Sequence, residues 1–269
     1  MSGAYYFERK EGDIIMEDWF EWNGKKCTDF GMHVLSQPAI ISPMERAEQQ
    51  KIPGKSGVLT VLEGDCVYDN ITPSCTCVID DPYMMVEGAT VSRIAAITGW
   101  LRGNGTIVFA NRPEGYYKGR VANQISFEKA VQGNPHRLFS VQFQCEPFFY
   151  LESGDTEITL TDSALLENPG NVPSAPLLVI SGTGDNATIM CGSSTMLIDF
   201  AGDNDPIESI TLDCEAKIAY TGTGTPSDPF VLRGTRVTGE WLTIPVGSNY
   251  FVMSEEVTSA VITPKWRVI

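Results

Sequence analysis

The chain has 269 residues, of which 42% are hydrophobic and 20% charged, and its formal net charge is −15. This length suits two domains, and the apolar content is enough for packed cores, which excludes global disorder. The acidic excess is concentrated late in the chain, because the residues from Asp155 onward include 15 acidic and 5 basic side chains. Such a protein repels nucleic acid and anionic membranes, so we expect neither as a partner.

Residues 1–17 differ from the rest of the chain and indicate a leader or flexible N-terminus. They lack the uninterrupted apolar core that comes after a basic start in a secretory signal. No apolar run in the chain has the length of a membrane span. The seven cysteines lie mostly in strand-like runs, which favours small, reduced, buried side chains in a protein that folds in a cytosol.

The N-terminal part reads as strands joined by turns. Residues Trp19–Cys27 predict a β-hairpin, because Asn23-Gly24 tolerates the positive φ angles of a tight turn. Gly31–Leu35 and Ile71–Ile79 predict further strands. Between them, residues 44–51 are nearly all helix formers and predict a short helix.

The best helix pattern runs from about Gly88 to Leu101, where apolar residues recur at helical spacing. Strands are expected at Thr106–Phe109, Tyr116–Phe127 and His136–Glu146. In the last of these, large apolar and polar side chains alternate with a period of two. We expect this strand to end at Glu146-Pro147, because proline cannot donate to a sheet ladder.

A stiff connection then separates two domains, because three prolines and a glycine fall within Asn168–Pro176. We therefore expect an N-terminal β-rich domain with one helix (18–152), a linker (153–175) and a C-terminal domain (176–269). After the linker only strands and turns are predicted, spaced as in a β-sandwich. The expected strands are Leu177–Ile180, Thr188–Cys191, Met196–Phe200, Ile210–Cys214, Trp241–Ile244, Tyr250–Met253 and Ala260–Val268.

Two glycine-containing stretches approach nucleotide-binding motifs without completing them. Gly54-Lys55-Ser56 lacks the earlier glycine of a P-loop, since Gln49 occupies that position, and it reads as a turn. Gly182–Ala187 approaches a dinucleotide fingerprint, but that mechanism requires a following helix. The residues after Ala187 are strand-like, so a hairpin turn is favoured.

Metal and catalytic readings are equally weak. Cys75 and Cys77 supply two thiolates where a structural zinc site needs four ligands, so a core cysteine pair is favoured. Asp203-Asn204-Asp205 offers oxygens to calcium but also reads as a polar turn. With only His33 and His136 available, nothing local supports a catalytic triad. We therefore predict no catalytic residue, no cofactor and no metal.

The order of several short motifs resembles the distal tail protein (Dit) family of long-tailed bacteriophages, the siphoviruses. Ile52–Gly57 resembles a proline-glycine motif of the family, but this chain has Lys55 where the family usually has arginine. The resemblance covers about Asp18 to Ile269. The matching stretches are Phe20–Gly24, Asp29–Gly31, Glu45-Arg46, Ile52–Gly57, Trp100-Leu101, Tyr116-Tyr117, Phe143–Phe148, Asn168–Asn171 and Ala175-Pro176.

The resemblance implies a structural role in the virion, at the tip of the phage tail, for a chain folded in the cytoplasm of the bacterial host. Such proteins form a homo-hexameric ring through a split-barrel-like first domain, and they carry a galectin-like β-sandwich outside the ring. The ring joins the tail tube protein to the tail-tip hub, a tail-associated lysin-like protein, and in some phages to a receptor-binding protein. The extended region from Gln37 to Val58 is then a candidate for reaching a neighbouring subunit, with Arg46, Ile52 and Lys55 as contact residues. An ordinary surface loop is the alternative.

Two other functions stay open. Trp241, Tyr250 and Trp266 are candidates for stacking on sugar in a carbohydrate-binding module, although such residues in a β-sandwich are usually core. Galectins hold sugar with a His-x-Asn-x-Arg strand, and the second domain has no histidine, so the resemblance to galectins concerns shape alone. A hydrolase with paired carboxylates is the third reading, and it requires a cleft that holds both of them.

Overall fold

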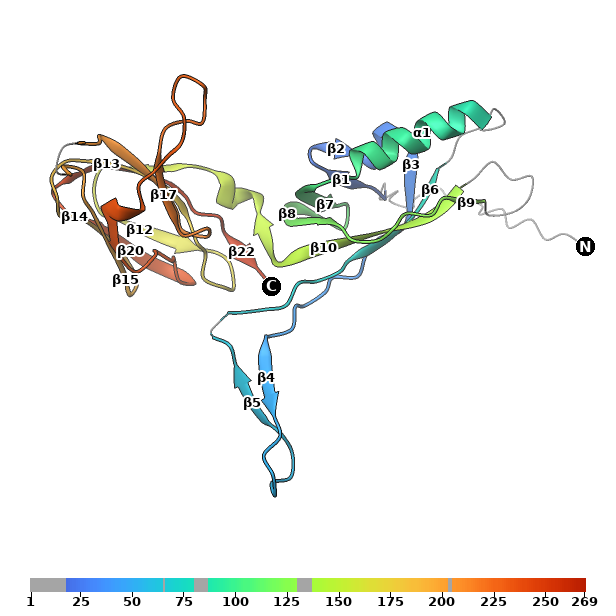
Figure 1. Cartoon of the computed structure of the whole chain (residues 1–269), viewed down its shortest axis with the longest axis horizontal. Coiled ribbons are helices and arrows are strands. Elements are labelled where there is room, and N and C mark those ends of the chain that lie inside the picture. Colours follow the sequence, from blue (N-terminus) through green and yellow to red (C-terminus); the bar gives the residue numbers. More distant parts are fainter. Residues whose placement is uncertain (1–17, 65, 80–86, 130–136, 203–204) are drawn as a thin grey trace, which may run out of the picture. The chain divides into compact units, whose positions relative to one another are not determined.

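The computed structural model describes residues 18–64, 66–79, 87–129, 137–202 and 205–269 (Figure 1). The predicted leader (1–17) lies outside this range, as do His136 and most of the Asp203–Asp205 turn. As the sequence predicts, the fold is mainly β with one α-helix. Two compact units make up the chain. Unit 1 extends to Ile40 and includes Thr72–Pro113 and Gly119–Gln144, and unit 2 comprises Ile41–Ile71, Glu114–Lys118 and Cys145–Ile269.

A nine-stranded sheet has the order β2-β1-β7-β8-β10-β6-β3, with β9 and β22 pairing along β10. The predicted N-terminal hairpin is confirmed, since Asn23 (φ 51°) and Gly24 (φ 75°) form the turn between β1 and β2. The strands are β1 (Phe20–Trp22), β2 (Lys25–Lys26), β3 (Met32–Ser36), β6 (Ser74–Ile79), β7 (Asn104–Phe109), β8 (Arg112–Val121), β9 (Glu128–Lys129), β10 (Arg137–Leu151) and β22 (Arg267–Val268).

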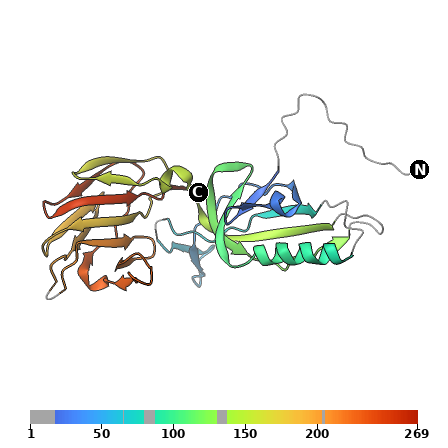
Figure 2. The ribbon, with the colours of Figure 1, turned by 90° about the horizontal axis from the view of Figure 1, so that it is seen from above.

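The helix α1 (Glu87–Trp100) agrees with the predicted helix to within one residue at each end (Figure 2). Its last residue, Trp100, packs the helix against other residues of unit 1. The Trp100 ring stacks on Phe20 and Phe30, at centroid distances of 5.6 and 4.3 Å, and its Nε1 donates a hydrogen bond to the Trp22 carbonyl oxygen at 3.0 Å. Within the described residues, α1 and the short 3₁₀ turns fall short of the length and apolarity of a membrane span.

The prediction that the long strand ends at Pro147 is wrong, because β10 continues to Leu151. The proline lies where the partners of β10 change. Cys145 exchanges backbone hydrogen bonds with Ile71, whereas Phe149 and Tyr150 are the residues paired with β22. Phe143, Cys145 and Pro147 direct their backbone nitrogens to the same edge of β10, so the missing N–H faces the gap between these two partners.

Unit 2 contains a β-sandwich of two antiparallel sheets. The six-stranded sheet has the order β11-β21-β13-β16-β17-β18, and the five-stranded sheet has the order β12-β20-β14-β15-β19. Their strands are β11 (Ile158–Leu160), β12 (Ala164–Asn168), β13 (Leu177–Gly182), β14 (Ala187–Cys191), β15 (Ser194–Ile198), β16 (Ser209–Asp213), β17 (Ile218–Thr221), β18 (Val231–Leu232), β19 (Val237–Gly239), β20 (Gly247–Met253) and β21 (Val257–Thr263).

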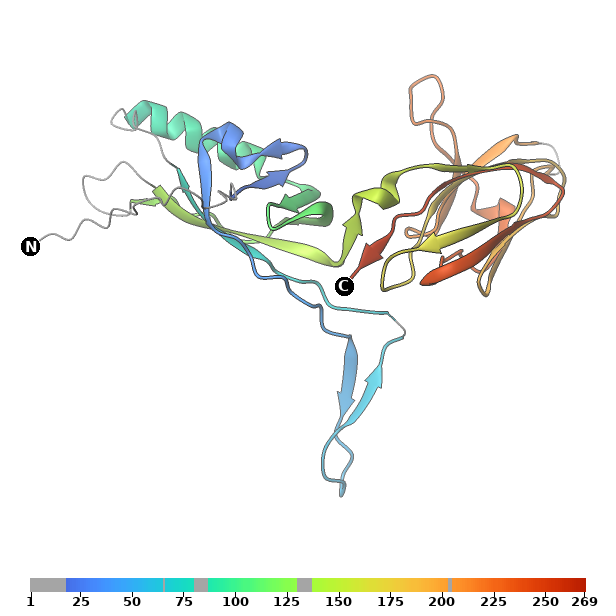
Figure 3. The ribbon, with the colours of Figure 1, turned by 180° about the vertical axis from the view of Figure 1, so that it is seen from behind.

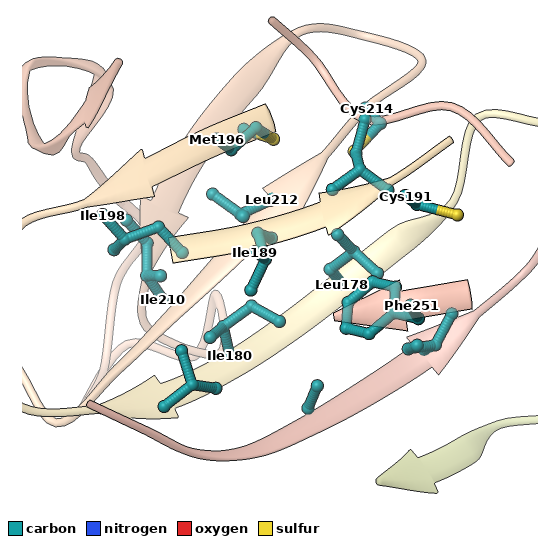
Figure 4. Packing of buried hydrophobic residues seen from close by; sticks show 14 of the residues in the cluster. Leu178, Ile180, Ile189, Cys191, Met196, Ile198, Ile210, Leu212, Cys214 and Phe251 are labelled. Atoms are coloured by element: carbon teal, nitrogen blue, oxygen red, sulfur yellow. The ribbon is translucent and has the colours of Figure 1, made fainter. Parts of the chain in front are cut away.

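Alternating side chains from both sheets fill the core of the sandwich (Figure 4). Leu178 and Ile180 of β13 point inward from one sheet, and Ile189, Ile198 and Phe251 point inward from the other; all five are fully buried. The intervening residues of each strand face outward. The alternation of apolar and polar residues that predicts these strands therefore also supplies the side chains of the core.

Three expectations in the sandwich need correction. Trp241–Ile244 forms no strand, and only Ile244 makes an isolated bridge, to Ser174. The predicted strand Ala260–Val268 is broken after Thr263, because Lys265 adopts a positive φ of 55° and the chain leaves the sandwich sheet to form β22. Gly182–Ala187 is no hairpin turn, since it carries the chain from β13 in one sheet to β14 in the other.

Candidate functional site

A hairpin formed by β4 (Ala47–Gln50) and β5 (Leu59–Leu62) makes a separate two-stranded sheet (Figures 1 and 3). The prediction of a short helix at residues 44–51 is therefore wrong. These residues have helical propensity but are too few to form a stable helix alone, and pairing with β5 fixes them as a strand. All eight strand residues are exposed.

Arg46 holds the base of the hairpin together. Its backbone N–H donates to the Val67 carbonyl at 2.9 Å, and its carbonyl accepts from the Glu63 N–H at 3.1 Å. The guanidinium Nε donates to Asp69 Oδ1 at 3.1 Å, and Nη1 lies 3.8 Å from Glu63 Oε2. Arg46 therefore forms its bonds within its own subunit. It lies at the base of the hairpin, in the region that was predicted to reach a neighbouring subunit.

The other two predicted contact residues lie in the loop between β4 and β5. Ile52 and Lys55 are exposed and belong to one turn, in which the Lys55 N–H donates to the Ile52 carbonyl at 3.2 Å. Gly54 has a φ of 80°, so Gly54-Lys55-Ser56 is the turn that the sequence predicts. A neighbouring apolar run went unpredicted, although its signal was present: β-type residues bounded by Gly57 and Gly64. Those exposed residues are Val58, Leu59, Val61 and Leu62.

The three aromatic residues proposed for sugar stacking do not share a surface. Trp266 is only 6% exposed and belongs to the sandwich core, and Trp241 is partly buried against the same core. Tyr250 is 58% exposed on the outward side of β20, directly opposite Leu165 of β12. Of the three predicted residues, Tyr250 therefore has the one well-exposed ring, and its neighbour across the strands is apolar.

The structure reveals a polar cluster that no local sequence pattern announces. Glu215 accepts hydrogen bonds from Lys118 Nζ and from the Tyr150 hydroxyl, both at 2.5 Å, and Arg267 Nη1 lies 3.3 Å away. Lys118 Nζ also lies 4.1 Å from the centre of the Tyr150 ring. The partners are 52 to 97 residues from Glu215 in sequence, so only the fold brings them together.

The electrostatics of this cluster indicate a fixed ion pair. Burial alone raises the pKa of the Glu215 carboxyl, but the hydrogen bonds from Lys118 and Tyr150 and the charge of Arg267 outweigh it, so the pKa lies below its usual value. Burial and the bond to Glu215 raise the pKa of Tyr150, which leaves its hydroxyl a protonated donor. This arrangement stabilises unit 2 and offers no activated nucleophile.

Glu215→Gln is expected to weaken the acid sensitivity of unit 2. Because the folded-state pKa of Glu215 lies below its ordinary value of 4.5, the carboxylate stabilises the fold above that value. The contribution is lost as the pH falls through the folded-state pKa. Wild type should therefore lose more melting temperature between pH 7 and pH 4 than Glu215→Gln, measured by circular dichroism. Glu157→Gln, at an exposed position, should follow wild type; equal losses in all three proteins would contradict the assignment.

Metal-binding and thiol chemistry find no support in the described residues. No group of three or more His, Cys, Asp and Glu side chains gathers there as a metal site would require. Cys75 and Cys77 are both fully buried in the core, as the sequence predicts, and burial raises the pKa of Cys77 to about 12. Asp205 forms ion pairs with Arg233 and Arg236, and His33 is exposed on β3.

No protein-family model matches the chain, and no curated protein sequence matches it either. Solved structures do match. Dit (gp 19.1) of phage SPP1, described as a paradigm of the hub adsorption apparatus in phages that infect Gram-positive bacteria, is similar at 12% identity with a TM-score of 0.65, over 91% of this chain and 97% of that chain.

Two structures of the phage P2 baseplate in its activated conformation, with Ca and with Sr, are more distantly similar. Their TM-scores are 0.47 and 0.45 at 8% identity, over 91% of this chain and 96% and 97% of theirs. The likeness to SPP1 Dit shows that this chain has the Dit fold along nearly its whole length. The predicted resemblance is thereby confirmed for the fold.

Proposed function

We propose that the chain is a structural subunit of a phage tail tip, which forms a hexameric ring between the tail tube and the tail-tip hub. The observation that carries this proposal is the Dit fold, shared with the SPP1 hub protein over 91% of the chain. The expected partners are the tail tube protein, the lysin-like hub protein and, in some phages, a receptor-binding protein. The proposed role is structural and not enzymatic, and its place is the virion.

The exposed β4–β5 hairpin supports assembly with a neighbour. An isolated two-stranded hairpin is marginally stable in water, and an uncovered apolar strand is a liability unless it is paired or covered. In a ring, each subunit presents one surface to a different surface of the next, so an exposed hairpin suits a head-to-tail contact. Arg46 would position the hairpin from inside the subunit, while Ile52, Lys55 and the apolar residues of β5 would contact the neighbour.

Light scattering over a concentration series tests the ring directly. The expected result is a particle of six times the 29.5 kDa chain mass, visible as a ring by negative-stain electron microscopy. Mass spectrometry of purified particles from the phage that encodes the chain is the second measurement. A chain that stays monomeric at every concentration and is missing from the particles would contradict the proposal.

Val61→Asp is expected to reduce hexamer formation strongly. Val61 is exposed on β5, so the charge costs the monomer little, but in a contact it would bury an unpaired carboxylate. The measurement is the same light-scattering series, with circular dichroism to check the fold. Leu232→Asp is the matched control, because Leu232 is an exposed aliphatic residue on β18 of the sandwich. Equal loss of hexamer in both variants would remove the hairpin from the contact.

Carbohydrate binding by the second domain is the alternative function. Its one supporting observation is the exposed Tyr250 ring, since exposed aromatic rings stack on sugars. The surroundings of the ring oppose it, because Leu165 and Val252 flank Tyr250 on the same face where sugar hydroxyls would need polar partners. A glycan array with wild type and Tyr250→Ala tests it: binding lost in the variant would support the alternative, and no binding by wild type would remove it.

A further inference from the structure

Large apolar side chains gather on the outer face of the five-stranded sheet of the sandwich. Their neighbours in each strand, such as Ile189, Cys191 and Phe251, point into the core, so these residues are not part of it. An antiparallel sheet with one face in water ordinarily carries polar residues on that face. The outward residues, between 37% and 63% exposed, are Leu165, Met190, Leu197, Tyr250 and Val252.

The strand register makes these five side chains one continuous patch, which we call the outer apolar patch. Leu165 of β12 lies directly opposite Tyr250 of β20, and Val252 lies opposite Met190 of β14. Tyr250 and Val252 are two apart on one strand and so share a face. Met190 of β14 pairs with Thr195 of β15. Leu197 lies two residues after Thr195 on the same face of β15, so it is the diagonal neighbour of Met190. Contiguous exposed apolar surface of this kind marks an interaction site.

The charges around the patch specify its partner. None of the five strands contains a lysine or arginine. Glu167 is exposed on the edge strand β12, and Glu240 is exposed where the opposite edge strand, β19, ends. Arg236, which precedes β19, is largely buried and engaged with Asp199 and Asp205. The five strands therefore give the patch an apolar centre and acidic edges, and they contribute no basic side chain to it.

We propose that the outer apolar patch is the docking surface for a different protein of the tail, one with an apolar centre and lysine or arginine at its margins. This inference rests on the proposed tail function and assigns the patch a partner. Interfaces have apolar, aromatic centres and polar rims, and complementary charge at the rim selects the partner. A second copy of the chain that presents the same patch fits poorly, because its Glu167 and Glu240 would then meet the acidic edges of the first copy.

Hydroxyl-radical labelling of the free chain and of intact particles tests this assignment. Tyr250 and Met190 should be labelled readily in the free chain and several-fold more slowly in particles, as read by peptide mass spectrometry. Phe230, which is 62% exposed at the edge of the other sheet, is the control and should change little. Particles that lack the chain overturn both the tail function and this inference. Particles that contain it, with Tyr250 and Met190 labelled as fast as in the free chain, overturn this inference alone.

Crosslinking and charge reversal then identify the partner. A photoreactive benzoylphenylalanine in place of Leu165 should crosslink to a different particle protein, at a segment that contains apolar and basic residues. Glu167→Lys combined with Glu240→Lys should lower the yield of that crosslink about tenfold, the effect of about 1.4 kcal/mol. The matched control is Glu157→Lys combined with Glu208→Lys, at exposed positions outside the five strands, which should leave the yield unchanged. A crosslink to a second copy of this chain, or equal losses in both charge reversals, overturns the proposal.

Discussion

Phe251→Ala is expected to destabilise unit 2 by about 3–5 kcal/mol, because the truncation leaves a cavity in a core that cannot fully collapse. Phe251 is fully buried on β20 of the five-stranded sheet, opposite Ala164 of β12 and Cys191 of β14. Its ring faces the other sheet across the sandwich (Figure 4). A loss of this size is a large fraction of the stability of an ordinary domain.

The measurement is urea unfolding, with hydrogen exchange of the β14 and β20 amides to place the loss in the sandwich. Phe230→Ala is the matched control, because it removes the same atoms from an exposed ring that contacts Tyr220 edge-on at 5.0 Å. That variant should lose about 1 kcal/mol or less, the value of an aromatic pair. Similar losses for Phe251→Ala and Phe230→Ala would show that the sandwich core is not packed as described.

Several strands whose two faces have different environments were predicted from the sequence. Leu177–Ile180 and Tyr250–Met253 lie within β13 and β20, because alternate residues must fill the core. By contrast, β17 (Ile218–Thr221), β18 and β19 went unpredicted. They are short, and neither β18 nor β19 contributes a fully buried side chain. Pairing with a neighbouring strand, not local pattern, defines them.

The candidate contact residues show the same difference between what the local sequence determines and what strand pairing determines. Ile52 and Lys55 were placed correctly in an exposed turn, because Pro53-Gly54 announces a turn by itself. The sequence cannot show that Arg46 is bound by Asp69, 23 residues away, since such a contact depends on the register of β4 with β5. It also cannot separate the exposed Tyr250 from the buried Trp266, because both lie in strand-like runs. Which side of a strand is buried depends on the sheet opposite.

Asn168→Ala is expected to destabilise the sandwich by about 3 kcal/mol, because it leaves two buried backbone groups, the Val172 carbonyl and the Gly170 N–H, without these partners. It also removes one of the two bonds of the Ile244 carbonyl, which keeps its bond from the Ser174 N–H. Asn168 is only 2% exposed. Its Nδ2 donates to the carbonyl oxygens of Val172 at 3.2 Å and Ile244 at 3.0 Å, and its Oδ1 accepts from the Gly170 N–H at 2.9 Å. Only glycine fits at position 170, since a Cβ there would lie 2.2 Å from the Arg267 carbonyl oxygen. The Asn168–Asn171 motif therefore holds this segment of the chain against the sandwich.

Asn171→Ala is the matched control in the same motif. Asn171 bonds the backbone of Ile269 through both side-chain atoms, but it is exposed, so water replaces the lost bonds. That variant should lose about 1 kcal/mol or less, measured by urea unfolding. Comparable losses for the two variants would contradict the role assigned to Asn168.

Asn168→Asp separates hydrogen bonding from packing, because it keeps the shape of the side chain. A carboxylate would place an oxygen in the position of Nδ2, facing the carbonyl oxygens of Val172 and Ile244. Burial and these dipoles disfavour the charged form, so the folded-state pKa of the new carboxyl lies above its unfolded value. The proton binds more strongly to the folded state, and the stability deficit relative to wild type should therefore shrink as the pH falls through that raised pKa. A deficit that stays constant from pH 7 to pH 4 would mean that the side chain at position 168 acts through packing and not through the hydrogen bonds of its amide.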